Sequence, residues 1–191
     1  VSLFHSVASF NNAGFDIFGG GQSMVPYADN IFLNIITCVL IFFGGIGFLV
    51  IQELWQKKCQ WKKLSMHTKV VLSVSLALII IGTLLIKLTE PVSWLCALFH
   101  SVSTRTAGFA SRPIGDFGAP ALLVMIVLMF IGASSGSTGG GIKTSTFFVL
   151  IRGIFSAATN QSEKAFHYSI PKDAFKKAAV ISILAAGVVI T

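Results

Sequence analysis

The chain has 191 residues, of which 54% are hydrophobic and only 11% are charged, and its mean hydropathy is +0.82. Soluble domains carry about 25% charged residues, so this composition excludes a single soluble domain. The net charge of +7 gathers in a few loops between apolar blocks, which argues against a nucleic-acid partner and for a lipid bilayer.

The apolar residues form long blocks that predict membrane spans. Residues 31–51 and 70–86 contain no charge, and residues 118–151 contain only Lys143. The last block, residues 178–191, is uncharged but shorter. A spanning helix needs about 20 apolar residues, so we count three full spans and the start of a fourth. We expect the chain to be a fragment of a longer protein.

Two basic loops fix the predicted orientation of these spans. Residues 52–69 separate the first and second spans, and residues 156–177 separate the third and fourth. Loops rich in Lys and Arg stay in the cytoplasm, so both are predicted to be cytoplasmic, with residues 1–30 and 87–118 facing outward. The basic residues in or next to these loops are Lys57, Lys58, Lys62, Lys63, Lys69, Arg152, Lys164, Lys172, Lys176 and Lys177.

An internal repeat organises the chain. The sequence LFHSV at residues 3–7 recurs at residues 98–102, and AGF at residues 13–15 recurs at residues 107–109. A long apolar block follows each copy. The predicted repeat unit is therefore a span, a short segment and a second span.

The short segments are predicted to enter the membrane and return on the same side. Pro91–Thr104, which Pro91 is expected to begin as a helix, would be about 21 Å long, against a hydrocarbon core of about 30 Å. The return paths are residues 11–14 (NNAG) and 105–108 (RTAG). A re-entrant helix followed by an extended, glycine-containing strand is the layout of a selectivity filter. The alternative is a pair of amphipathic surface helices, although residues 1–15 carry no charged face.

A glycine-rich stretch, GASSGSTGGGIK at residues 132–143, interrupts the third block. Three consecutive glycines destabilise a helix by about 3 kcal/mol relative to alanine, so we expect a break. Three interpretations compete. A phosphate-binding loop would need Lys143 directly after Gly141, but Ile142 intervenes. A loop outside the membrane would leave flanks too short to span. The third is a broken helix that lines a water-filled pore.

The two aligned copies, residues 4–19 (FHSVASFNNAGFDIFG) and 99–117 (FHSVSTRTAGFASRPIGDF), resemble the second and third pore loops of the Trk/Ktr/HKT potassium transporter superfamily. The similarity is strongest to the membrane subunit of the bacterial Ktr type. It implies an all-α integral membrane fold, in which span–pore-helix–span units form a pseudo-fourfold pore like that of a potassium channel, with about two of four units present. It assigns residues 1–51 to unit two, 52–69 to a cytoplasmic loop, 70–155 to unit three, 156–177 to a second cytoplasmic loop, and 178–191 to the first span of unit four.

The resemblance also implies a function. It is potassium uptake across the plasma membrane through a filter of backbone carbonyls, gated by an intramembrane loop below it. No cofactor is implied beyond the transported K+, with Na+ as a candidate coupling ion. The implied partners are a second copy in a homodimer and a cytoplasmic, KtrA-like ring of nucleotide-binding regulatory subunits. The implied filter residues are Asn11, Asn12, Ala13, Gly14, Arg105, Thr106, Ala107 and Gly108, and the implied gate residues are Gly136, Ser137, Thr138, Gly139, Gly140, Gly141 and Lys143.

Two cationic side chains need a separate explanation. Arg105 lies in the filter approach, where a cation would repel the permeating ion, although the family motif has Arg there too. We predict that its side chain turns away from the ion path, towards backbone carbonyls or a carboxylate. Lys143 is predicted to tether the loop to a carbonyl or carboxylate, to set a positive barrier in the cavity, or to reach the inner interface.

Two other functions fit a membrane chain of this kind. One is a secondary transporter that binds a solute between broken helices, and such transporters show inverted repeats. Here both re-entrant segments are predicted to enter from the same side. The other is a membrane scaffold, which would not need paired filter-like segments. The sequence contains no acid–base pair, activated nucleophile or metal-ligand cluster, so no enzymatic activity is expected.

Overall fold

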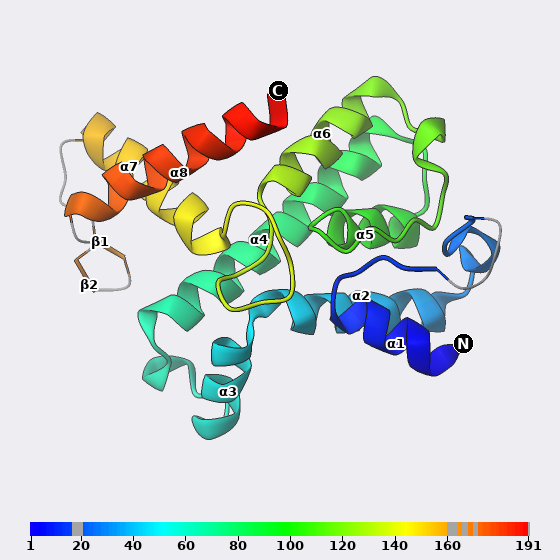
Figure 1. Ribbon diagram of the computed structural model, residues 1–191, viewed down its shortest axis with the longest axis horizontal. Helices are drawn as coiled ribbons and strands as arrows, with labels where there is room; N and C mark the ends of the chain where they lie inside the picture. Colours follow the sequence, from blue (N-terminus) through cyan, green and yellow to red (C-terminus); the bar gives the residue numbers. More distant parts are fainter. Residues whose placement is uncertain (17–20, 160–163, 166–167, 170–171, 191) are drawn as a thin grey trace.

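The computed structural model describes residues 1–16, 21–159, 164–165, 168–169 and 172–190 of the chain. These residues form helices packed around one long central helix, α4 (Figure 1). In chain order the elements are α1 (Ser2–Phe10), η1 (Val25–Tyr27), α2 (Ile31–Ile46), α3 (Phe48–Gln56), η2 (Trp61–Lys63), α4 (Met66–Thr89), α5 (Trp94–Ser103), η3 (Ile114–Asp116), α6 (Ala119–Phe130), α7 (Thr144–Thr159), β1 (Lys164–Ala165), β2 (Tyr168–Ser169) and α8 (Lys172–Ile190).

Among the described residues the regular elements are helices, apart from a short antiparallel pair, β1 and β2, of two residues each. The all-α class predicted from the sequence is therefore confirmed. Parts of the predicted cytoplasmic loop 156–177, namely residues 160–163, 166–167 and 170–171, lie outside the described residues. The predicted loop is too long at both ends, because α7 continues to Thr159 and α8 begins at Lys172.

Helix α4 is the centre of the packing and contacts α5, α6 and α7. Ser65 caps its N-terminus by accepting a hydrogen bond from the Thr68 N–H, so the helix begins at Met66 and not at Val70, where the charge-free block starts. Among the described residues, α4 alone is long and apolar enough to cross a membrane as one straight helix. The bent pair α2–α3 passes the same test when its two parts are taken together.

The prediction of a continuous span over residues 31–51 is wrong. The helix stops at Ile46 and restarts at Phe48, and the two parts are bent by 95°. The residue between them is Gly47, whose φ of +91° lies in the left-handed region that side chains disfavour. In Figure 1, α3 accordingly turns away from the direction of α2. Counting charge-free residues cannot detect such a break, because glycine does not interrupt an apolar block.

The short helices α1 and α5 carry the two copies of the repeat. Both pack against α2, and α5 also packs against α4. Each has a buried histidine: His5 lies 2.9 Å from the Thr37 hydroxyl on α2, and His100 lies 3.0 Å from the Cys96 carbonyl of its own helix. The expected start of α5 at Pro91 is wrong, since Ser93 caps the helix by accepting from the Cys96 N–H and the helix begins at Trp94.

Two apolar clusters hold the helices together. One joins α4, α5 and α6 through buried residues that include Ile86, Ala97 and Met125. The other joins α1, α2 and α5 through Ala8, Ile41 and Phe99, and it extends into the turns that follow α1 and α5. The second cluster brings the two copies of the repeat side by side, and it therefore positions the candidate site.

Candidate functional site

The two predicted filter segments, residues 11–14 and 105–108, meet at their glycines. A Cβ placed on Gly14 would lie 2.4 Å from the Ala107 carbonyl oxygen and 3.1 Å from the Gly108 Cα. The two backbones are thus in direct contact, although more than 90 residues separate them in the sequence. Just outside this contact, the Met24 N–H donates to the Ala110 carbonyl at 3.0 Å, and the Ala110 N–H donates to the Ser23 hydroxyl at 3.1 Å.

The two segments also share an unusual backbone conformation. Asn12 has a φ of +52° and Gly14 of +66°, and the matching residues Thr106 and Gly108 have values of +76° and +88°. A non-glycine residue with positive φ is uncommon. Strained backbone of this kind persists only where the surroundings enforce it, and it gathers at functional sites. Its occurrence at the same two places in both copies shows that the repeat extends to backbone geometry.

The expectation that both segments are extended strands is wrong in their first residues. Asn11 donates from its N–H and its amide group to the Val7 carbonyl, and it thereby caps the end of α1. The Arg105 N–H donates to the Val102 carbonyl at 3.3 Å, and the Thr106 N–H to the Thr104 carbonyl at 2.8 Å. The chain therefore leaves each short helix through tight turns, which extend to Asn12 in the first segment and to Ala107 in the second.

Within the described part of the chain, no donor contacts the carbonyl oxygens of residues 11–14 or 105–108. A cavity of about 270 Å³ opens beside them and is lined by residues of both segments, including Asn12 and Thr106, together with α5 and α6. Backbone carbonyl oxygens that have no protein donor and lie beside a cavity are chemically suited to coordinate a cation.

Arg105 is 8% exposed, and its guanidinium turns towards α4 and the glycine-rich stretch. It donates to the carbonyl oxygen of Ser75 at 3.3 Å, to the Ser75 hydroxyl at 3.3 Å and to the Gly132 carbonyl at 3.4 Å. The prediction that this side chain seeks backbone carbonyls is confirmed. Its position joins the start of the second filter segment to Gly132, the second residue after α6.

Residues 131–143, hereafter the glycine-rich loop, leave α6 and return to α7 at nearly the same point. A parallel bridge joins Ile131 to Ile142, and the Ala133 N–H donates to the Gly140 carbonyl at 3.1 Å. Lys143 folds back over the loop and donates to the Gly139 carbonyl at 2.8 Å, so the predicted tether to a carbonyl is confirmed. The loop is thereby closed on itself at its base.

The tip of the glycine-rich loop lies against both filter segments. A Cβ placed on Gly139 would lie 2.5 Å from the Thr106 hydroxyl and 3.3 Å from the Asn12 side chain. The hydroxyl of Thr138 donates to the carbonyl of Phe10, the last residue of α1, at 3.2 Å. Only glycine fits at position 139, because any side chain there would displace the filter segments or the loop.

Sequence reasoning missed Ser134, which is fully buried and joins the loop to α2. Its N–H donates to the Gly45 carbonyl at 3.0 Å, and its hydroxyl donates to the Ile46 carbonyl at 2.7 Å. The predicted gate residues begin only at Gly136. No local signal distinguishes Ser134 from the serine that follows it, because its partners, Ile46 and Gly45, lie 88 and 89 residues earlier in the chain.

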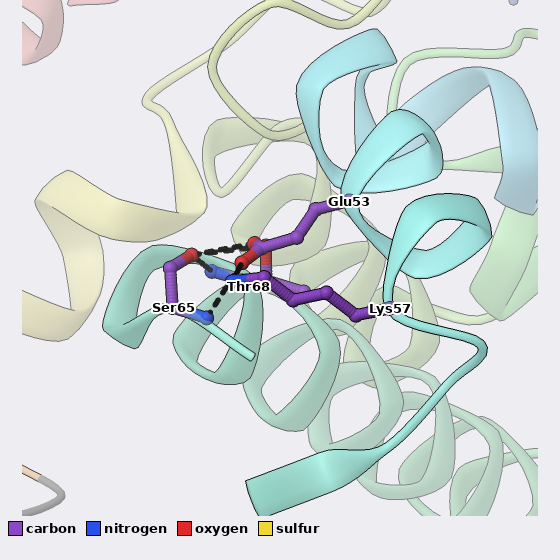
Figure 2. Close-up of polar contacts among 4 residues, drawn as sticks. All are labelled: Glu53, Lys57, Ser65 and Thr68. Atoms are coloured by element: carbon purple, nitrogen blue, oxygen red, sulfur yellow. Dashed lines mark hydrogen bonds and ion pairs between the residues drawn. The ribbon is translucent and has the colours of Figure 1, made fainter. Parts of the chain in front are cut away.

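A second polar cluster fixes the far end of α3. Figure 2 shows the Glu53 carboxylate pointing from α3 into the first turn of α4, beside Lys57, Ser65 and Thr68. It accepts hydrogen bonds from the Lys57 ammonium at 2.5 Å, from the Ser65 N–H at 2.8 Å, from the Ser65 hydroxyl at 2.6 Å and from the Thr68 hydroxyl. This Glu53 clamp was also missed, although Glu53 and Lys57 stand four residues apart, at ion-pair spacing on a helix.

The clamp gives a prediction about pH. Burial alone would raise the pKa of Glu53, but the hydrogen bonds from Lys57, Ser65 and Thr68 outweigh it and lower the pKa from 4.5 to about 2. A carboxyl with a depressed folded-state pKa stabilises the fold fully above its unfolded value, and this stabilisation is lost as the pH falls through the folded value. Wild-type protein should therefore resist unfolding better than the Glu53→Gln variant above pH 4.5, by about 1–3 kcal/mol, and the difference should vanish near pH 2. Thermal unfolding of both proteins in detergent, at pH values across this range, measures the difference in stability. A difference that does not change with pH would show that the carboxylate charge is not what stabilises the clamp.

Comparison with known proteins places the chain in a family. The TrkH family profile, described as cation transport protein, matches residues 1–90 and 64–190. The Ktr system potassium uptake protein B of Vibrio alginolyticus is 44% identical over 164 residues, which are 78% of this chain and 35% of that protein. The potassium/sodium uptake protein NtpJ of Enterococcus hirae is 37% identical over 161 residues, with the same two coverages. The chain therefore spans about a third of the length of these relatives.

A solved structure has the same fold. The potassium transporter TrkH from Vibrio parahaemolyticus superposes with a TM-score of 0.69 at 22% sequence identity, over 91% of this chain and 40% of that one. This likeness establishes the arrangement of helices, and the family match covers nearly every residue of the chain. The chain belongs to the TrkH family of cation transport proteins.

Proposed function

We propose that this chain forms about half of a potassium pore, in which residues 11–14 and 105–108 supply part of a selectivity filter. The observation that carries the proposal is the contact of the two filter segments at Gly14 and Gly108. One backbone conformation is repeated there, and no donor among the described residues contacts the carbonyls. Carbonyl groups held in this way can replace the hydration shell of an ion. The chain covers 40% of the solved TrkH structure, which accords with about two of four units.

Potassium is the proposed ion, and its uptake across the plasma membrane the proposed activity. Two relatives carry the words potassium uptake or potassium/sodium uptake in their names. The basic loops support a multi-pass topology with residues 52–69 and 156–177 in the cytoplasm. We propose the glycine-rich loop as the gate, because it lies against both filter segments.

The proposed partners are a second copy of the protein and a cytoplasmic ring of nucleotide-binding subunits. The name of the Vibrio alginolyticus relative, protein B of a Ktr system, accords with further components in such a system. The surfaces available for a cytoplasmic partner are the basic loops, where Lys58, Lys62 and Lys63 are exposed. Binding of the full-length protein to such a ring should weaken when these lysines are replaced by glutamate.

The test of the proposed filter is the ratio of rubidium to sodium uptake by the full-length protein, measured for wild type and Gly108→Ser. Serine is disfavoured by about 1–2 kcal/mol at a φ of +88°, so the segment should relax and its carbonyls should move. The expected result is a ratio about tenfold lower than in wild type. Gly115→Ser is the matched control, since no described atom lies within 4 Å of a Cβ built there. An unchanged ratio in Gly108→Ser would contradict the filter, and uptake of an organic solute without rubidium uptake would favour a solute transporter.

A further inference from the structure

The glycine-rich loop does more than lie beneath the filter segments, because it also completes the broken helix α2–α3. The bend at Gly47 leaves the last carbonyls of α2 without the N–H partners that a continuous helix would give them. The loop supplies replacements. Thr138 donates from its N–H at 3.3 Å and its hydroxyl at 3.2 Å to the Gly44 carbonyl, and Ser134 donates to the carbonyls of Gly45 and Ile46.

At the start of α3 the roles are reversed, and the helix donates a hydrogen bond to the loop. The Phe48 N–H donates to the Gly136 carbonyl of the loop at 3.0 Å. In the part of the chain that the structure describes, no acceptor contacts the N–H groups of Leu49 and Val50. The loop thus takes the place of the missing turn of helix.

The same backbone groups have a second set of partners available. In a continuous helix over residues 31–56, each N–H donates to the carbonyl four residues earlier. Phe48 would then donate to Gly44, Leu49 to Gly45 and Val50 to Ile46. These are the three carbonyls that Thr138 and Ser134 now contact, and the single Phe48 N–H cannot serve both Gly136 and Gly44, so the docked loop and a straight helix compete for the same groups.

We propose that the glycine-rich loop and the α2–α3 bend form a single two-state element, in which release of the loop from the filter is coupled to straightening of the helix. The inference rests on the proposed gate, and it identifies the hydrogen bonds that replace those lost when the loop moves. When the loop leaves, the three carbonyls it abandons are taken up by the N–H groups of α3. The three carbonyls therefore have a donor in both states, and the N–H groups of Leu49 and Val50 gain an acceptor in the straight state, which offsets the loss of the loop contacts.

Two further sets of contacts hold the bent state. The buried side chain of Val50 packs with Ile46 of α2 and Val71 of α4, and the Glu53 clamp fixes the end of α3 to the first turn of α4. Straightening a helix that is now bent by 95° would carry Glu53 away from Ser65 and Thr68. Movement of α3 would therefore couple the basic loop between α3 and α4, at one end of the helix, to the gate at the other end.

Gly47 is the position where the two states differ most. Its φ of +91° exists only in the bend, and a Cβ there would lie 2.8 Å from the Ser135 carbonyl and 3.1 Å from the Ser134 hydroxyl. Alanine at this position favours helical backbone and clashes with the docked loop. Gly47→Ala should therefore shift the element towards the straight helix and the released loop.

The test is rubidium uptake by full-length Gly47→Ala protein, together with its structure determined by electron cryo-microscopy. We expect uptake to rise about fivefold or more, and the helix to run unbroken from residue 31 to residue 56. Gly115→Ala is the matched control. Uptake at the wild-type level with the 95° bend retained would overturn the coupling.

A second variant keeps the proposal testable if Gly47→Ala protein does not fold. Thr138→Val preserves the shape of the side chain but removes the hydroxyl that bonds to Gly44 and Phe10, and it should raise uptake about fivefold. Thr89→Val, which removes a hydroxyl bonded only within α4, is the control and should leave uptake unchanged. If removing the loop raises uptake but neither variant does, the gate stands and the coupling fails; if removing the loop has no effect, the gate itself is wrong.

Discussion

Replacing Gly14 with alanine should reduce rubidium uptake by the full-length protein about tenfold or more, and this loss should be larger than the loss in Gly108→Ala. The two glycines occupy the same place in the repeat, and both have positive φ values. Their surroundings differ. A Cβ on Gly14 would lie 2.4 Å from a backbone carbonyl oxygen of the other segment, which cannot move without distorting that segment as well. A Cβ on Gly108 meets only the Gly14 Cα, at the ordinary contact distance of 3.6 Å.

The comparison separates packing from backbone strain. Both variants introduce alanine in the left-handed region, which is disfavoured by about 1–2 kcal/mol, so any difference between them reports the contact between the two segments. Gly115→Ala, at an open position, controls for the substitution itself. Equal losses of uptake in Gly14→Ala and Gly108→Ala, with equal amounts of protein in the membrane, would show that the two segments do not meet as described.

Deleting residues 134–139 should raise rubidium uptake about tenfold or more. If the closed state dominates, the open state is a minor population of about 0.1–10%, and removing the obstruction makes it the main one. The deletion removes Ser134 and Thr138, which donate to α2, and Gly139, which packs against both filter segments, and it keeps Gly132, which accepts from Arg105. The new junction is short, because the Ala133 N–H already donates to the Gly140 carbonyl at 3.1 Å.

The control for the deletion is Gly140→Ala. Position 140 lies in the same loop, but no described atom lies within 4 Å of a Cβ built there, so uptake should stay at the wild-type level. Measuring sodium uptake in parallel tests whether the filter segments stay intact when the loop is removed. Unchanged or reduced rubidium uptake by well-expressed deletion protein would mean that the loop supports the pore and does not obstruct it.

Much of the architecture follows from local patterns in the sequence. The repeated LFHSV sequence predicts both short helices, and the charge-free block at residues 70–86 predicts α4. Arg105 could be predicted to seek carbonyls because a buried guanidinium must find acceptors. Helix ends were less predictable. Ser65 and Ser93 set the starts of α4 and α5 through capping, which hydropathy does not register.

The contacts that make the site distinctive are long-range and could not be predicted. Gly47 has an apolar neighbourhood suited to a straight span, and only its contact with residues 134–136 explains the bend. Only the hydrogen bonds to Gly45 and Ile46 distinguish Ser134 from the other serines of the loop. Likewise, Gly14 and Gly108 are equivalent in the repeat and differ only because one backbone packs more tightly than the other.

The most direct test of the filter is to locate rubidium in the full-length protein. Anomalous X-ray scattering from crystals grown in rubidium would show where the ion lies relative to residues 11–14 and 105–108. The expected result is an ion coordinated by carbonyl oxygens of both segments, beside Gly14 and Gly108, with the Arg105 guanidinium turned towards Ser75 and Gly132. Rubidium bound elsewhere in the membrane region, with these carbonyls bonded to protein donors, would contradict it.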